Sequence, residues 1–248
     1  MHKLVKVSIP QESKHKHDVE HALEEHALAR LVANRRTGFD PFYRFNYEYS
    51  IPSPGRYNWQ WFWDSCFHII ALARLDPAMA EAELKTLLWA QREDGFIGHL
   101  TYWGRRGAFM SALYGQSRIG EWRRRHSGII QPPVLAQALG ELWRQTQDPK
   151  LLKNYLPKVR AYYEWLHCER DPDGIGLIGI ISPYESGTDN NPSFDRELGL
   201  SNPRRLGILW ANRKLDWYNA ICGRNFHYRS LVLRDRFIAV DPFINSVY

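Results

Sequence analysis

The sequence has few cysteines and no long apolar run. Its three cysteines, Cys66, Cys168 and Cys222, are an odd number without a C-x-x-C spacing. This argues against a disulfide framework and favours a reducing compartment. No stretch reaches the ~18 apolar residues of a membrane helix, and the first residues lack the features of a signal peptide. His99 and His126 have no ligand spacing with other histidines or cysteines. We therefore expect a cytoplasmic protein without membrane, metal or cofactor.

The chain also lacks a large net charge. The net charge is +6, and the basic residues are scattered apart from one run at 123–126. A solvated surface segment is the favoured interpretation of that run, since no nucleic-acid-binding motif accompanies it. A basic nucleic-acid binder remains a weak alternative, which predicts strongly salt-dependent binding to any duplex. We expect no nucleic-acid partner, and the sequence does not indicate an oligomeric state.

Apolar residues at helical spacing dominate the chain. Short turns separate many of these segments, while Gly-containing loops at 92–100 and 171–180 each follow the second helix of a pair. Residues 40–58 are rich in aromatics and helix breakers, so we expect them to be irregular. The pattern predicts one all-α domain of helical hairpins. The expected helices are 17–34, 64–75, 77–91, 132–147, 150–168, 206–225 and 227–240.

The last eight residues have the pattern of a helix start. Asp241 is suited to cap a helix and Pro242 to occupy its first position, with Ile244 and Tyr248 on one face. A domain seldom ends on such a start. We therefore expect residues 1–248 to form a single domain that is truncated at its C-terminus.

The segment WQWFWDS, residues 59–65, places a carboxylate in an aromatic surface. An aromatic ring such as Trp63 stacks on the apolar face of a sugar, while carboxylate and amide oxygens bind its hydroxyls. Asp64 supplies the carboxylate, and Gln131 in GIIQPPVLAQAL supplies an amide. A core helix start is the alternative interpretation. His68, one turn after Asp64, is more simply explained as a packed helix histidine than as a catalytic group.

The segment PYESGTDNNPSFD, residues 183–195, is a loop, because its prolines and glycine exclude an α-helix. Glu185 and Asp189 lie within it, shielded by Tyr184 and Phe194. Neighbouring carboxylates in a shielded site raise one pKa, as a general acid requires near neutral pH. Ordinary turn chemistry of Asp and Asn side chains is the alternative.

The three segments WQWFWDSCFH, IIQPPVLAQAL and PYESGTDNNPSFD resemble, in order, those of one glycoside hydrolase family. It includes processing α-glucosidase I and the mannosylglycerate and glucosylglycerate hydrolases, and the resemblance is greatest to the latter branch. It implies an (α/α)6 toroid and an inverting mechanism. Asp189 would be the general acid and Asp64 would bind sugar hydroxyls. The resemblance also gives the expected substrate-binding set: Tyr57, Trp63, Asp64, Gln131, Tyr184 and, in the loop of the acid, Glu185.

An inverting hydrolase also needs a general base, about 6.5–9.5 Å from the acid. In the family this is a glutamate in later helices, which we do not find in this chain, so the resemblance implies an incomplete toroid. We expect inverting hydrolysis of an α-glycosidic bond in a small or charged glycoside, mannosyl- or glucosylglycerate-like, or in an α-glucoside. The expected partner is a carbohydrate substrate. Alternatives are an inactive or sugar-binding remnant without the base, and a trehalase-like activity.

Overall fold

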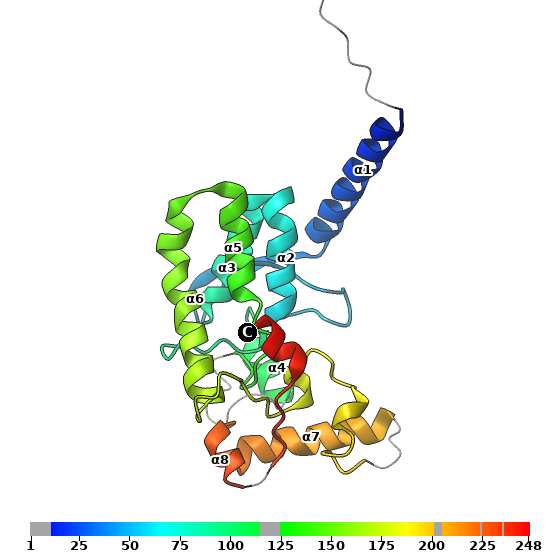
Figure 1. The fold of residues 1–248 in the computed structure, drawn as a ribbon. Coiled ribbons are helices and arrows are strands. Elements are labelled where there is room, and N and C mark those ends of the chain that lie inside the picture. The colour runs from blue at the N-terminus through cyan, green and yellow to red at the C-terminus, as the bar shows by residue number, and fades with distance from the viewer. Residues whose placement is uncertain (1–10, 115–124, 201–204, 224, 235) are drawn as a thin grey trace, which may run out of the picture.

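The computed structural model describes residues 11–114, 125–200, 205–223, 225–234 and 236–248. Most of the described residues are helical. Four helices lie side by side in the upper body of the molecule, and α1 projects away from it (Figure 1). Helix α2 packs on both α3 and α5, and α5 packs on α6. These four helices are α2 (Phe62–Leu75), α3 (Pro77–Trp89), α5 (Leu135–Thr146) and α6 (Pro149–Arg170).

The remaining helices lie outside this group. Helix α9 lies near the end of the four-helix group at which α7 and α8 are found (Figure 1). The C-terminal helix starts at Pro242, as the sequence predicts, and Asp241 accepts a hydrogen bond from the Ile244 backbone nitrogen. The bounds are α1 (Gln11–Ala33), α4 (Gly107–Tyr114), α7 (Arg205–Ile221), α8 (Tyr228–Val232) and α9 (Pro242–Val247).

An Asp-Pro pair starts α3 and α6 in the same way. Asp76 accepts a hydrogen bond from the Met79 backbone nitrogen, and Asp148 accepts one from that of Lys150. The following proline occupies the first turn, where its missing N–H would have no helical partner. Capping side chains of this kind stabilise a helix by about 1 kcal/mol each. Tight connections therefore join α2 to α3 and α5 to α6.

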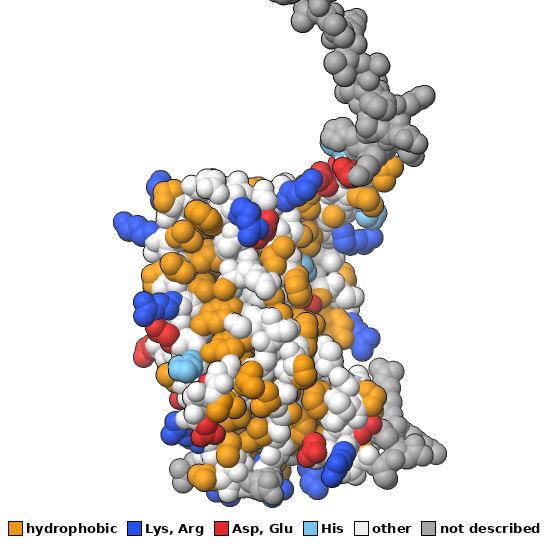
Figure 2. Space-filling model, viewed as in Figure 1, with side chains coloured by type: hydrophobic (Ala, Val, Ile, Leu, Met, Phe, Trp, Pro, Cys, Tyr) orange, Lys and Arg blue, Asp and Glu red, His pale blue; other side chains and the backbone are white. Residues whose placement is uncertain are grey.

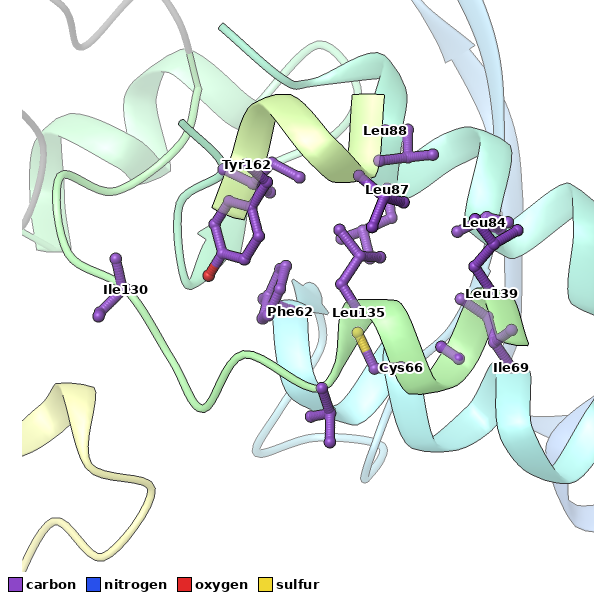
Figure 3. Close-up of a cluster of buried hydrophobic side chains, with 14 of the residues drawn as sticks. Phe62, Cys66, Ile69, Leu84, Leu87, Leu88, Ile130, Leu135, Leu139 and Tyr162 are labelled. Carbon is purple, nitrogen blue, oxygen red and sulfur yellow. The ribbon is translucent and has the colours of Figure 1, made fainter. Parts of the chain in front are cut away.

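The core fills the space between these helices (Figure 3). On α2 the buried residues Phe62, Cys66, Ile69 and Ala73 recur at helical spacing. Helix α3 presents an apolar stripe to this core, and all four residues of the stripe are essentially inaccessible. Leu135 and Leu139 of α5 and Tyr162 of α6 complete the cluster (Figure 3). The stripe of α3 consists of Ala80, Leu84, Leu87 and Leu88.

The expected irregular segment contains a β-hairpin. Strand β1 (Arg35–Asp40) pairs antiparallel with β2 (Phe45–Ser50), from Arg35 opposite Ser50 to Asp40 opposite Phe45. Alternate aromatics of β2 pack against Trp103, which explains why the segment is extended. A second short pair joins β3 (Gln60–Trp61) to β4 (Leu100–Thr101) and fixes the start of α2.

Further expectations differ from the structure. Helix α4 was not expected, and α8 is much shorter than the predicted helix 227–240. Trp89 and Trp143, near the ends of α3 and α5, are each more than one third exposed. Trp89 stacks on Phe45 of β2, with 4.2 Å between ring centroids.

The predicted basic surface run is not a solvated patch in its described part. Arg125 is buried and forms an ion pair with the buried Asp40, and His126 is buried as well. Residues 123 and 124 lie outside the described residues. Apolar side chains gather over the middle of the face in view in Figure 2, and the charged ones lie mostly near its edges.

Candidate functional site

The start of α2 brings the first two sequence segments together. The Trp63 backbone nitrogen donates a hydrogen bond of 3.1 Å to the side-chain oxygen of Gln131. Nitrogens in the first turn of a helix have no partner within the helix, so an amide oxygen stabilises this start. Trp63 and Gln131 therefore lie side by side, as the sequence predicts for a shared site, but the Gln131 oxygen has a structural partner.

A glycine brings the third segment into contact with the other two. Gly187 has a φ of +74°, which favours glycine. A Cβ atom there would lie 2.8 Å from the Trp63 ring and 3.1 Å from Pro132. The loop thus approaches the indole as closely as the backbone permits. The contact joins the PYESGTDNNPSFD loop to both WQWFWDS and IIQPPVLAQAL.

Glu185 anchors this loop from inside the protein. Its carboxylate accepts two hydrogen bonds, of 2.8 and 2.6 Å, from Arg170 at the end of α6. It also accepts the backbone N–H groups of Ile130 and Ile181, at 2.8 and 2.7 Å. Both residues of the ion pair are essentially inaccessible.

The position of Glu185 differs from the sequence-based expectation of substrate binding. Its oxygens are occupied by protein groups, and no part of the side chain reaches the surface. Such a buried pair fixes the position of a segment, because removal of one partner would leave an unpaired charge. We therefore assign Glu185 to the support of the site.

Asp64 and Asp189 are the two carboxylates whose pKa is raised at this site. Loss of hydration is the main cause for each, although Asp64 is half-buried and Asp189 lies exposed on its loop. The charge of Asp64 further raises the pKa of Asp189. The expectation of a raised pKa in the loop thus agrees with the structure, but the neighbouring carboxylate is Asp64 rather than Glu185.

Tyr184 lies beside the same loop. Burial raises its pKa to about 12, and the charges of Asp216 and Asp189 raise it as well, while Arg213 lowers it. Tyr57 is placed by a different contact, an edge-to-face arrangement with Trp61 at 5.4 Å between ring centroids. Tyr184 therefore shares an environment with Asp189, whereas Tyr57 extends the aromatic surface of the first segment.

Two supporting residues were not found from the sequence. Arg170 has no local pattern that distinguishes it from the other cations of α6. Asp216 is the only acidic residue of α7, and a single acidic residue on a helix could have indicated this supporting role from the sequence. Its carboxylate is buried and accepts a hydrogen bond of 3.2 Å from Ser182, which precedes the loop that contains Asp189.

Two further features of the structure concern possible metal and ligand sites. Among the described residues, no group of three or more His, Cys, Asp or Glu side chains is arranged to bind a metal ion. A cavity of about 470 Å³ is lined by residues that include Asp173, Glu197, Tyr228 and Arg236. It contains no residue of the three sequence segments, so we do not assign the sugar site to it.

Comparison with known proteins identifies the family. Residues 57–248 match the model of the mannosylglycerate hydrolase MGH1-like glycoside hydrolase domain. This match covers most of the chain, and the chain belongs to that family.

The relatives include mannosylglycerate hydrolase MGH2 of Selaginella moellendorffii, 34% identical over 156 residues, which are 60% of this chain and 31% of the relative. Mannosylglycerate hydrolase of Thermus thermophilus is 34% identical over 155 residues, 60% of this chain and 37% of the relative. Glucosylglycerate hydrolase of Mycolicibacterium hassiacum is 33% identical over 169 residues, 62% of this chain and 38% of the relative.

A solved structure agrees with these sequence matches. The GH63 mannosylglycerate hydrolase from Thermus thermophilus, in complex with Tris and D-glycerate, gives a TM-score of 0.72 at 25% identity. The similarity covers 91% of this chain and 56% of that one. The chain thus spans little more than half of this solved relative. Among the described residues, no helix is long and apolar enough to cross a membrane.

Proposed function

We propose that this chain is a glycoside hydrolase domain acting on an α-glycosidic bond of a small or charged glycoside. The observation that carries the proposal is the meeting of three segments at the start of α2, where Gln131 accepts a hydrogen bond from the Trp63 nitrogen and Gly187 lies against the Trp63 ring. The Trp63 ring lies against the backbone of Gly187, which is part of the loop that contains Asp189. An aromatic ring beside two carboxylates fits the apolar and hydroxylated faces of a sugar.

Asp189 is the proposed general acid. Loss of hydration and the charge of Asp64 favour its protonated form, which can donate a proton to the leaving glycosidic oxygen. Asp64, in the first turn of α2, is the proposed hydroxyl-binding group, with Trp63 as the stacking surface. Tyr57, Gln131 and Tyr184 are proposed to line the sugar site.

The names of the relatives support a mannosyl- or glucosylglycerate-like substrate. A simple α-glucoside and a trehalase-like reaction are the neighbouring possibilities within the same chemistry. We further propose that the helical pairs form part of an (α/α)6 toroid and that hydrolysis inverts the anomeric configuration.

Sugar binding without turnover is the second candidate. Glu185 is the carboxylate nearest to the acid in the sequence of this loop, but it is held by Arg170 and two backbone amides. It therefore cannot serve as the base that activates water. A binding domain needs Asp64 and Trp63 but no base.

The test uses purified chain with mannosylglycerate, glucosylglycerate and trehalose, one at a time. Released sugar is quantified, and its anomeric form is followed by proton NMR. In a protein that also supplies the general base, which we do not find in this chain, the proposal predicts hydrolysis with inversion and a loss of about 10²–10⁴-fold in Asp189→Asn. Asp18→Asn on the exposed surface of α1 is the matched control.

Saturable binding without turnover, lost in Trp63→Ala, would establish the second candidate. If none of the three glycosides bound or reacted, the assignment of this site to such sugars would be wrong.

A further inference from the structure

Glu83 of α3 is a carboxylate buried in the helical body. Its side chain is fully inaccessible, and one oxygen accepts a hydrogen bond of 3.1 Å from the Ser50 backbone nitrogen. A buried carboxylate is costly unless a positive charge or several hydrogen bonds compensate it. Within the described ranges, no Lys or Arg forms an ion pair with Glu83. The other oxygen is paired with His68 of α2, whose Nδ1 lies 3.1 Å away.

His68 links this buried pair to the proposed sugar site. It lies one helical turn after Asp64, and residues at this spacing are neighbours on one helix face. Burial lowers the pKa of His68, but Glu83, Asp64 and a hydrogen bond with the Ser50 backbone outweigh it and raise the pKa above its usual value. The ring is therefore surrounded by groups that favour its charged form.

The same charge acts on Asp64. Burial raises the pKa of Asp64, and His68 is the strongest of the influences that lower it again. The Asp64 backbone and a side-chain hydrogen bond with Trp63 also lower it, whereas Glu83 raises it slightly. His68 thus opposes the loss of the Asp64 charge in a partly buried site.

We propose that His68 is a positioning residue whose protonated ring neutralises Glu83 and keeps the Asp64 carboxylate ionised for binding sugar hydroxyls. The coupling of the three groups follows from their arrangement on α2 and α3. Its purpose in sugar recognition rests on the proposed function. An ionised carboxylate binds hydroxyl groups more strongly than a neutral acid, because charge-assisted hydrogen bonds are about twice as strong.

The first experiment measures titration without any sugar. Carboxyl-carbon NMR follows Asp64, assigned by its loss in Asp64→Asn, in the wild type and in His68→Gln. The account predicts that the Asp64 midpoint moves to higher pH in His68→Gln. It predicts the reciprocal effect as well, a lower midpoint for the His68 ring in Asp64→Asn. His21→Gln, which removes an exposed histidine paired with Glu25 on α1, should leave the Asp64 midpoint unchanged.

A second variant covers the risk that His68→Gln fails to fold with Glu83 unpaired. The double variant His68→Gln, Glu83→Gln leaves no unpaired buried charge. Glu83 raises the pKa of Asp64 less than His68 lowers it, so the midpoint should still rise. An unchanged Asp64 midpoint in either folded variant, with only the melting temperature lowered, would overturn the proposal in favour of a purely structural His68.

The functional consequence is measured separately. In the double variant, sugar binding should weaken at a pH between the two measured Asp64 midpoints, where the carboxyl of the wild type is ionised to a greater extent than that of the variant. Unchanged affinity in the presence of a shifted Asp64 midpoint would overturn the role in recognition. Because the titration needs no ligand, its outcome is independent of whether the chosen glycosides bind.

Discussion

At the scale of single residues, close contact and charge explain the site better than residue type alone. Gly187 is required by its positive φ and by the Trp63 ring that lies against it. The charge of Asp64 raises the pKa of Asp189, although the two residues belong to segments that are far apart in the sequence. Their neighbours in the fold, rather than in the sequence, determine how they ionise.

Gly187→Ala tests the close approach of the loop to Trp63. We expect a destabilisation of about 2–3 kcal/mol, because a Cβ adds backbone strain and a clash with the indole ring. Chemical denaturation gives the free energy of unfolding. The matched control is Gly174→Ala, which also has a positive φ but nothing within 4 Å of the added Cβ. Its cost should be about 1 kcal/mol; equal costs for the two variants would contradict the contact.

Asp189→Asn tests the electrostatic state of the proposed acid through stability. A carboxyl whose pKa is raised by folding holds its proton in the folded state over a pH range in which the unfolded chain has released it. Stability therefore falls as pH rises from the usual pKa to the raised one. The asparagine variant lacks this loss, so it should be more stable than the wild type at neutral pH.

Thermal unfolding at neutral pH and at about pH 3, where the carboxyl is largely protonated in both states, makes this comparison. The advantage of Asp189→Asn should disappear at the lower pH. An advantage that is the same at both pH values would show that it does not come from ionisation.

At the scale of elements, the ion pair between Arg170 of α6 and Glu185 anchors the loop at 183–195, which carries Asp189. Arg170→Met should destabilise the protein by about 3–5 kcal/mol, because Glu185 would remain buried without its partner. Arg160→Met, which removes the exposed partner of Glu164 on the same helix, should cost less than ~1 kcal/mol. Urea denaturation of both variants measures the difference. Similar small costs would contradict the anchoring role of Arg170.

Much of the helical framework was predictable from the sequence. Helical spacing and Asp-Pro starts located α2, α3, α6 and α9 because these signals act within a few residues. The β1–β2 hairpin was missed, although the alternating aromatics of β2 are a strand pattern. Its stability depends on Trp103, which is distant in the sequence.

The site was predictable to a lesser extent. The motifs indicated Trp63, Asp64 and Asp189, and their order in the chain suggested a common site. The buried role of Glu185 was not predictable, because it depends on Arg170 and on backbone groups of Ile130 and Ile181. Side-chain type gives the possible chemistry, but only the fold shows which oxygens already have partners.

At the scale of the whole molecule, three segments that are far apart in the sequence meet at one end of α2. Helix packing fixes WQWFWDS, a side-chain hydrogen bond attaches Gln131, and the Glu185–Arg170 pair places the third loop. The family match over residues 57–248 includes all three segments. A single carbohydrate site is the simplest function that uses them together.

The most direct test of this claim is an NMR titration of the chain with mannosylglycerate. We expect the Trp63 indole and the carboxyl carbons of Asp64 and Asp189 to shift together, with one common dissociation constant. Shifts confined to one of the three groups, or no saturable shift in any of them, would contradict a shared sugar site.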